Sequence, residues 1–290
     1  MGSSLLQISC AEIEEVRMKI IALVENTTAS AEYRCKHGLS LYIETEKHKI
    51  LFDLGSDRLF AENAKKLNID ITEIDTVVIS HGHKDHGGAL KEFMAINSHA
   101  KIYIKKEAFE PHYIKVLGLP FHVGLDEKLL NEQQIILTDD TMLIDEELFL
   151  FSNVKPETFV SKSNRVLYSK KQGYLQSDDF DHEQSLILTV NGQSVLVSGC
   201  SHAGIVNIVN KAESLIPTEI TTVIGGFHLY NPPTKKYESN EMIDTIAVAL
   251  AKKNFIYYTC HCTGMQAYKR MKKMLGKELH YLSTGTVVML

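Results

Sequence analysis

The chain has 290 residues, of which 44% are hydrophobic and 23% are charged, with only 6 prolines and 17 scattered glycines. This composition excludes collagen-like, disordered and coiled-coil proteins, and the length suffices for a large hydrophobic core. The formal net charge of −5 disfavours a nucleic-acid-binding protein held by bulk positive charge, and no apolar run approaches the roughly 20 residues that cross a bilayer.

The first residues of the chain and its cysteines indicate the cellular compartment in which we expect the protein. Residues 1–17 contain Glu12, Glu14 and Glu15 instead of a basic start followed by an apolar block, so we expect no secretory signal there. We interpret this segment as an N-terminal extension, which a misassigned upstream start would also explain. The five cysteines are odd in number and unevenly spread, which argues against a disulfide scaffold and favours a reducing cytoplasm.

The predicted elements follow from apolar runs and turn signals. A buried first strand covers 18–24, and two strand pairs follow, at 39–45 with 49–54 and at 185–190 with 193–198. Further short strands at 76–80, 221–225 and 255–259 each lead through a loop to a predicted helix, at 88–96, 238–253 and 265–275. The irregular segment 121–181 is predicted to form a flap or insertion over one end. Strands that alternate with helices predict a layered α/β sandwich, and the lack of a dividing linker predicts one domain over 18–290.

The loop after the strand at 76–80 carries the strongest chemical signal. It reads SHGHKDHGG from Ser80 to Gly88, so four residues of ligand type fall in six positions. Just past a strand, His81 and His83 alternate onto one side, while Asp85 and His86 turn toward a neighbouring point. Imidazole and carboxylate are ligands of zinc, iron and manganese, so the loop predicts two sets of ligands for two divalent metal ions. We favour zinc over iron or manganese.

This loop resembles the His-x-His-x-Asp-His signature of the metallo-β-lactamase superfamily. The early strand-end aspartate of the family matches Asp53, to which the resemblance assigns the support of the ligand loop. The late histidine of the family matches His261, which follows a predicted C-terminal strand. The resemblance covers nearly all of 18–290 and implies a four-layer αββα sandwich, with the metals at one edge between two sheets.

The middle of the chain departs from the family pattern. Cys200 stands where a bridging acid is expected, so it is a further candidate ligand, although a small buried thiol explains it equally well. One alternative for the missing ligand of the first metal is His202, which we favour because it follows a buried strand in a glycine-flanked loop, as His81 does. The other alternative is the group of Asp181, His182 and Glu183.

A further histidine, His228, follows the strand at 221–225 in the sequence GGFHL. Together with GCSHAG around Cys200 and HCTG from His261, it resembles a branch of the superfamily labelled 7,8-dihydropterin-6-methyl-4-(β-D-ribofuranosyl)aminobenzene-5′-phosphate synthase. We interpret His228 as a substrate-facing acid or hydrogen-bond donor, and a histidine packed beneath the site is the alternative.

Other candidate residues are given plainer interpretations. Cys260 and Cys262, which bracket His261, are interpreted as packing residues around a ligand. The histidines expected to be solvated at the surface are His37, His48, His99, His112, His122 and His280. If the substrate is a phosphate ester, its cationic contacts are expected in the irregular segment, at Lys162, Arg165, Lys170 and Lys171.

These residues predict a metallohydrolase in which a metal-activated hydroxide attacks a small ester, lactone, thioester or phosphodiester, related to pterins or phosphates by its branch. Asp85 would orient the nucleophile and hold the second metal, and His228 would stabilise the developing oxyanion. The alternatives are an iron-dependent redox or dioxygen-active protein on the same fold and a non-catalytic ligand sensor. We expect a small-molecule substrate and no membrane or nucleic-acid partner, and a homodimer is the one assembly considered.

Overall fold

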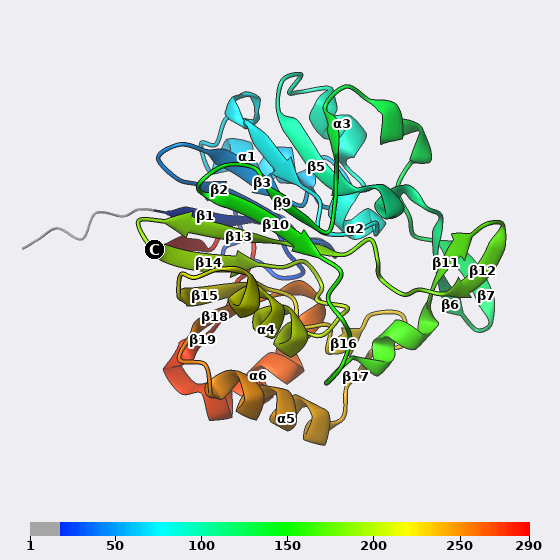
Figure 1. Cartoon of the computed structure of the whole chain (residues 1–290), viewed down its shortest axis with the longest axis vertical. Helices are drawn as coiled ribbons and strands as arrows, with labels where there is room; N and C mark the ends of the chain where they lie inside the picture. The colour runs from blue at the N-terminus through cyan, green and yellow to red at the C-terminus, as the bar shows by residue number, and fades with distance from the viewer. Residues whose placement is uncertain (1–17) are drawn as a thin grey trace, which may run out of the picture.

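Two seven-stranded sheets lie face to face in the middle of the molecule, as Figure 1 shows for 18–290, the residues that this computed structural model describes. The predicted extension at 1–17 lies outside these residues. The first sheet has the order β20 (Val287–Met289), β1 (Lys19–Val24), β2 (Ser40–Glu44), β3 (Lys49–Phe52), β4 (Thr76–Val78), β5 (Lys101–Lys105) and β8 (Ile135–Thr138). The second has the order β19 (Leu279–Tyr281), β18 (Ile256–Thr259), β15 (Ile220–Gly225), β14 (Gln193–Val197), β13 (Gln184–Val190), β10 (Leu148–Ser152) and β9 (Thr141–Leu143).

Helices cover the outer face of each sheet (Figure 1). On the first sheet lie α1 (Leu59–Lys66) and α3 (Leu90–Met94), and the short α2 (Lys84–Gly87) lies at its edge. On the second sheet lie α4 (Ile205–Leu215), α5 (Asn240–Ala251) and α6 (Met265–Leu275). The short 3-10 helices are η1 (Ile71–Glu73), η2 (Lys106–Phe109), η3 (Glu127–Asn131), η4 (Lys162–Val166), η5 (His261–Thr263) and η6 (Gly276–Glu278).

Apolar side chains hold these layers together in three buried clusters. One cluster joins the first sheet to α1 and α3, a second joins the other sheet to α4, α5 and α6, and a third fills the space between the sheets. Each sheet is therefore covered on both faces, which explains why its central strands are apolar runs without polar alternation. The predicted four-layer αββα sandwich is confirmed.

In both sheets a hairpin is followed by parallel strands. β2 and β3 pair antiparallel, and β4, β5 and β8 continue in parallel from β3. β13 and β14 also pair antiparallel, and β15, β18 and β19 continue in parallel from β14. Because parallel strands end at the same edge of their sheet, the loops after β3, β4, β14, β15 and β18 are brought to one end of the sandwich, where α/β proteins bind ligands.

The helix predicted at 88–96 is shortened to α3, and a separate short helix, α2, precedes it inside the histidine-rich loop. The carbonyl of His86 accepts a hydrogen bond from the backbone N–H of Leu54 at 2.7 Å, and the N–H of Ala89 donates to the carbonyl of Gly55 at 3.2 Å. A continuous helix would use both groups internally. The chain after β3 therefore interrupts the helix and fixes the histidine-rich loop against the first sheet.

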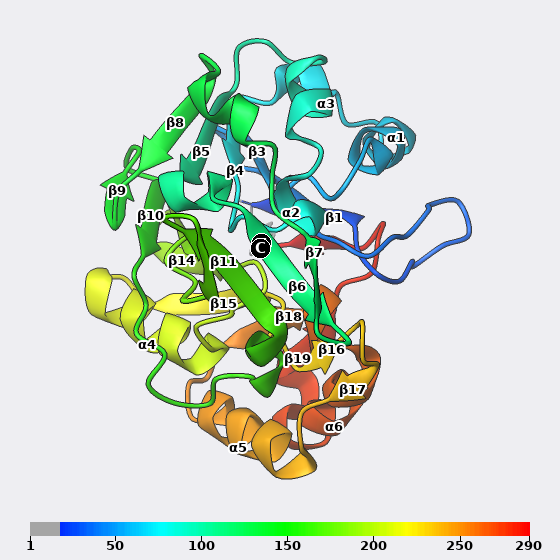
Figure 2. The same cartoon turned by 90° about the vertical axis from the view of Figure 1, so that its right-hand side faces the viewer.

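The prediction that 121–181 forms one insertion is wrong in its limits. β8, β9 and β10 fall inside that segment but complete the two main sheets. The part that stands out is a four-stranded sheet of β12 (Tyr174–Ser177), β11 (Leu167–Lys171), β6 (His112–Val116) and β7 (Leu119–His122), half of which precedes the predicted insertion. Figure 2 shows this sheet in front of the sandwich edge, near the two-stranded β16 (Tyr230–Asn231) and β17 (Lys236–Tyr237). Local pattern did not separate these strands, because their pairing partners are distant in sequence.

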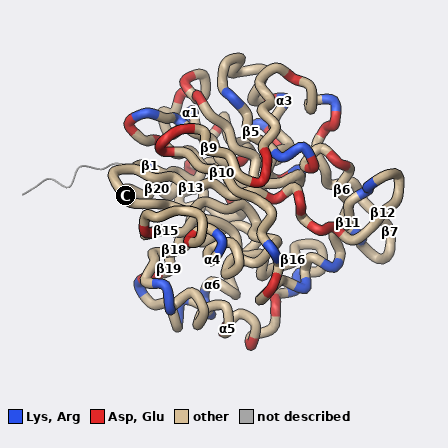
Figure 3. The backbone as a smooth tube through the Cα atoms, viewed as in Figure 1, with Lys and Arg blue, Asp and Glu red and all other residues tan. Residues whose placement is uncertain are grey.

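The charges are spread around the molecule. In Figure 3, lysine and arginine alternate with acidic residues along the outline, and this view has no continuous basic stripe. Within 18–290, every helix is too short or too polar to serve as a bilayer-crossing segment.

Candidate metal centre

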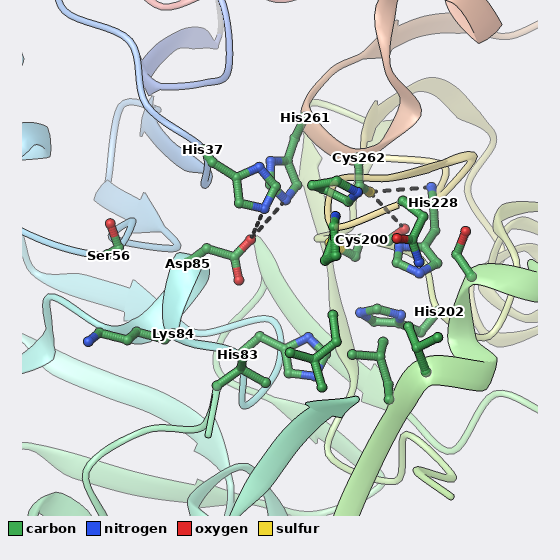
Figure 4. Close-up of a pocket in the computed structure, with 18 of the residues that line it drawn as sticks. His37, Ser56, His83, Lys84, Asp85, Cys200, His202, His228, His261 and Cys262 are labelled. Atoms are coloured by element: carbon green, nitrogen blue, oxygen red, sulfur yellow. Dashed lines mark hydrogen bonds and ion pairs between the residues drawn. The ribbon is translucent and has the colours of Figure 1, made fainter. Parts of the chain in front are cut away.

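The predicted site residues lie together at the edge where the two sheets meet, and Figure 4 labels those that line the cavity there. They come from the loops after β3, β4, β14, β15 and β18, and they are Asp53, His81, His83, Asp85, His86, Cys200, His202, His228 and His261. All of the histidines among them are more than nine-tenths buried. A group of imidazoles so poor in water contact needs protein partners or a bound ion to satisfy its nitrogens.

The first set of imidazoles consists of His81, His83 and His202. The Nε2 atoms of His81 and His202 lie 3.4 Å apart. The ring of His83 lies 4.6 Å from that of His81 and 5.0 Å from that of His202, measured between ring centroids. The Nε2 of His83 is buried and has no hydrogen-bond partner among the described residues. The ring of His83 thus lies beside the pair formed by His81 and His202, and it also groups within 4.8 Å with His112, Asp178 and His182.

Neighbouring side chains fix the tautomers of this set. The Ser80 hydroxyl donates to Asp53 at 2.8 Å, so it accepts a hydrogen bond from Nδ1 of His81, also at 2.8 Å. The Asn164 amide nitrogen donates to the carbonyl of His202, so its Oδ1 accepts from Nδ1 of that residue at 3.0 Å. This network assigns the protons of both rings to Nδ1. The two Nε2 atoms, which lie 3.4 Å apart, therefore each carry a lone pair that is free to bind a metal ion.

The second set contains Asp85, His86 and His261. Nδ1 of His86 donates to Asp53 at 2.6 Å, and Nδ1 of His261 donates to Asn26 at 3.0 Å. Their Nε2 atoms lie 3.2 Å apart, and the Asp85 carboxylate lies 3.2 Å from Nε2 of His261 and 3.7 Å from that of His86.

The two sets of histidines differ in the charge that their surroundings favour. Burial opposes a charge on His86, but the carboxylates of Asp53 and Asp85 outweigh it and raise the pKa of His86 to about 9. In the first set, burial and the neighbouring imidazoles hold the pKa of His81 and of His202 well below its usual range. These rings are therefore neutral, which is the form that binds metals.

The spacing of the donors fits a divalent metal ion. With Zn–N bonds of about 2.0–2.1 Å and tetrahedral angles, two ligand nitrogens lie about 3.3 Å apart. The observed separations of the paired Nε2 atoms are 3.4 Å and 3.2 Å. Each nitrogen pair therefore has the spacing that a divalent ion requires, and the hydrogen bonds to Nδ1 supply the outer support that such ligands usually have.

Cys200 lies between the two sets. Its Sγ is 3.2 Å from Nε2 of His86, and it groups within 4.8 Å both with His81 and His202 and with His86 and His261. One sulfur that reaches both sets occupies the place of a bridging ligand. Burial holds the pKa of the Cys200 thiol well above its usual range, so a nearby cation would be needed to favour the thiolate.

His228 lines the cavity in front of these groups. Its ring centroid lies 4.2 Å from that of His202, and it is 7% exposed. Neither ring nitrogen has a hydrogen-bond partner among the described residues. Its backbone adopts a left-handed conformation with φ of 49°, as do Asp53, Ser201 and His261 at 60°, 61° and 49°. Non-glycine residues adopt this conformation at an energetic cost, and it concentrates at functional sites.

Within the group at 181–183, the ring of His182 stacks on that of His81 at 6.0 Å between centroids, whereas the two carboxylates make other contacts. The Glu183 carboxylate accepts hydrogen bonds from the backbone N–H groups of His202 at 2.6 Å and Ala203 at 2.9 Å. Burial raises the pKa of Glu183 to about 7, against the effect of these two bonds. Asp181 pairs with Lys171 at 2.5 Å. Of the two alternatives, the structure thus brings His202 to the first set, and Glu183 holds the loop that carries it.

A second buried network lies behind His83. His182 accepts a hydrogen bond from the N–H of Gly82 at 2.9 Å and donates to Asp178 at 3.3 Å, while His112 donates to Asp178 at 3.0 Å. Burial of Asp178 is outweighed by these bonds, so its pKa lies well below its usual range. The expectation that His112 is solvated is therefore wrong. It lies at the start of β6 and is enclosed by the second network, which the local sequence does not reveal.

His37 was also missed. Its Nε2 lies 3.1 Å from the Asp85 carboxylate, and its ring lies 4.7 Å from that of His261. Burial is outweighed by Asp85, so the pKa of His37 is raised. The His37 side chain is exposed, as predicted, and only its contact with Asp85 was missed. The prediction is wrong for His48, whose side chain is largely buried between Asp75 and Asp145. A histidine before β2 gave no sequence signal of these contacts.

A cavity of about 480 Å³ opens in front of the centre. Its apolar wall consists of Ile114, Val123, Val166, Leu167, Pro232 and Pro233. Its cationic residues are Lys36 and Lys84, so the expectation of contacts from Lys162, Arg165, Lys170 and Lys171 is wrong. Lys36 pairs with Asp57, whereas no acidic group among the described residues lies within ion-pair distance of Lys84. The four-stranded sheet supplies Ile114 and Leu167 to the cavity wall.

The sandwich and its histidine-rich edge are those of a metallo-β-lactamase, and the chain belongs to the metallo-β-lactamase superfamily, whose sequence model matches residues 33–161. It is 30% identical to the 7,8-dihydropterin-6-methyl-4-(β-D-ribofuranosyl)-aminobenzene-5′-phosphate synthase of Methanocaldococcus jannaschii, over 93% of this chain and 96% of that protein. The predicted superfamily and branch are confirmed.

Two further similarities concern the chemistry of the fold. A solved metal-dependent hydrolase of the β-lactamase superfamily is 26% identical, with a TM-score of 0.80 over 94% of this chain and 99% of that one. The anaerobic nitric oxide reductase flavorubredoxin of Aeromonas salmonicida is 29% identical over 43% of this chain, which corresponds to 26% of that protein.

Proposed function

We propose that this chain is a metallohydrolase with two divalent metal ions, for which zinc is favoured over iron or manganese. Its substrate is a small ester, lactone, thioester or phosphodiester, and the phosphate named for the Methanocaldococcus relative favours the last. The observation that carries this proposal is the facing of imidazole nitrogens in two pairs, 3.4 Å and 3.2 Å apart, at the floor of a cavity.

Two sets of side chains would hold the ions. His81, His83 and His202 form the set for the first ion, and Asp85, His86 and His261 form the set for the second, with Cys200 in reach of both. When bound, two such ions supply a hydroxide nucleophile at neutral pH and polarise the electrophilic oxygen of the substrate.

The residues of the chain contribute orientation and proton donation. The Asp85 carboxylate, which lines the cavity, would accept a hydrogen bond from the attacking nucleophile and orient it. Neither ring nitrogen of His228 has a partner within 18–290, so one of them can donate to the developing oxyanion or to the leaving oxygen. A donor that is already placed needs no reorganisation during the reaction.

The cavity walls favour a substrate with an apolar body and an anionic group. The apolar wall excludes water and strengthens the hydrogen bonds made inside. The ammonium group of Lys84, without an acidic partner among the described residues, would attract a phosphate at the side of the cavity.

The test combines metal analysis with a panel of substrates. The full chain should contain about two equivalents of zinc, iron or manganese by elemental analysis and should hydrolyse at least one of bis(p-nitrophenyl) phosphate, a thioester, a lactone or p-nitrophenyl acetate. His81→Ala and Asp85→Ala should lose both metal and turnover. His48→Ala, at the other end of β3, is the matched control and should keep both. Full activity in either site variant would contradict the proposal.

A second candidate function is iron-dependent redox chemistry, which the flavorubredoxin similarity favours. Metal content and activity assays distinguish the two candidate functions. Protein purified without oxygen that contains iron, consumes dioxygen or nitric oxide with an added electron donor, and leaves every ester intact would support the second candidate and overturn the first.

A further inference from the structure

We propose that Cys200 and Cys262 form a reactive thiol pair which hydrogen peroxide converts into a disulfide, and that this modification withdraws the Cys200 sulfur from the metal centre. The formation of the disulfide depends only on the placement of the two thiols. Its effect on metal binding rests on the function proposed above.

The two cysteines are 62 residues apart in sequence but adjacent in the fold. Cys200 follows β14 and Cys262 lies in η5 after β18, and both strands flank β15. Their sulfur atoms group within 4.8 Å of each other and of a ring nitrogen of His228, and the Cys262 thiol donates to the carbonyl of Cys200 at 3.4 Å (Figure 4). Both are free thiols, so each can contribute a sulfur to an S–S bond.

A small oxidant can reach this pair through the cavity. Cys200 and Cys262 both line it, and they are 4% and 3% exposed. Hydrogen peroxide is little larger than water, so it can enter where a bulky thiol reagent cannot. Cys260, one position before the ligand His261, is fully buried in the apolar cluster between the sheets and does not line the cavity. Proximity to the centre alone therefore does not make a cysteine accessible.

The surroundings favour attack by the sulfur of Cys262. The backbone N–H of His228 donates to this sulfur at 3.3 Å. A donor at that position stabilises the negative charge that the sulfur carries when it attacks an electrophile. Cys200 is then the resolving thiol, because its sulfur lies in the same group.

The chemistry balances with one molecule of peroxide. The Cys262 thiol attacks the O–O bond, which breaks to give a sulfenic acid on Cys262 and one water. The Cys200 thiol then attacks the sulfenic sulfur, the S–S bond forms, and the sulfenic oxygen leaves as a second water. The two sulfurs together lose two electrons, which reduce the peroxide oxygens.

The consequence follows from the position of Cys200. Its sulfur lies 3.2 Å from Nε2 of His86 and is the only described sulfur that groups with both imidazole pairs. A thiolate is a strong ligand, whereas a disulfide sulfur carries no charge and binds divalent ions weakly. We therefore expect oxidation to weaken the binding of at least one metal ion about tenfold or more. Removal of a group that only hydrogen-bonds to a metal ligand already has an effect of this size.

The test uses the full chain, purified under reducing conditions and then treated with equimolar hydrogen peroxide. Expected are the loss of two free thiols after denaturation, a mass decrease of two hydrogen atoms, and a peptide that links Cys200 to Cys262, all reversed by dithiothreitol. Cys262→Ser should abolish the link, and Cys260→Ala, the matched control, should keep it. Two intact thiols, separate sulfinic acids on both cysteines, or a link to Cys10 or Cys35 would overturn the proposal.

Metal release is measured separately with a chromogenic chelator. Oxidised protein should release at least one metal equivalent that the reduced protein retains, and Cys262→Ser should retain it after peroxide. A disulfide that leaves the metal content unchanged would overturn the effect on the centre. Reduced protein that never binds metal would instead refute the proposed function, and the thiol count and the peptide map would still decide whether the pair forms.

Discussion

Replacement of Asp53 by asparagine should weaken metal binding without disrupting the fold. The buried carboxylate accepts three hydrogen bonds, from the backbone N–H of Ser80 at 2.8 Å, from the Ser80 hydroxyl at 2.8 Å and from Nδ1 of His86 at 2.6 Å. An asparagine has one oxygen, which can keep the backbone bond. Its amide nitrogen then faces Nδ1 of His86, where two N–H groups cannot bond.

The imidazole of His86 must respond by changing its tautomer. With the proton moved to Nε2, the nitrogen that faces His261 can no longer donate a lone pair. Loss of such outer support typically lowers metal affinity 10- to 100-fold, which corresponds to about 1.4 to 2.7 kcal/mol. Since the amide has nearly the size of the carboxylate, we expect little change in the packing around it.

The assay is a competitive titration of the metal-free protein with zinc against a chromogenic chelator. Asp53→Asn should weaken one ion by 10- to 100-fold through His86 and should also weaken the other, because the Ser80 hydroxyl that holds Nδ1 of His81 loses its acceptor. Asp75→Asn is the matched control, since Asp75 also accepts from a histidine Nδ1 and a backbone N–H, but at the other end of the sheet. Equal affinities of Asp53→Asn and unsubstituted protein, or equal losses in both variants, would refute this reasoning.

Three further substitutions test other parts of the site. Asp178→Asn removes the carboxylate that accepts hydrogen bonds from His112 and His182, so the free energy of unfolding in urea should fall by about 3 kcal/mol; a change below 1 kcal/mol would show that these bonds contribute little to stability. His228→Ala should lower kcat about 10²- to 10³-fold on a hydrolysed substrate while elemental analysis shows unchanged metal, and an unchanged kcat would remove His228 from the reaction. Lys84→Met should raise KM about tenfold for a phosphodiester but not for a neutral ester, with Lys84→Arg largely restoring it; equal effects on both substrates would exclude an anion contact.

The sequence by itself predicted the turns, helices and ligand loop that are formed by residues close together in the chain. The turn at Asn191 and Gly192 joins β13 to β14 as predicted, and α6 spans the predicted 265–275. His81 and His86 fall within six positions, so one loop sufficed to predict a metal centre with two sets of ligands. These features arise from local hydrogen bonds and side-chain spacing, which any sequence window contains.

The tertiary structure decided which distant loops meet. The parallel pairing of β14, β15 and β18 brings Cys200 beside Cys262, and it presents His202 to His81 while Glu183 only holds that loop. The burial of His112 and the contact of His37 with Asp85 depend on strands far away in sequence. Such contacts are set by long-range strand pairing and by the filling of the core, and a local pattern carries no record of either.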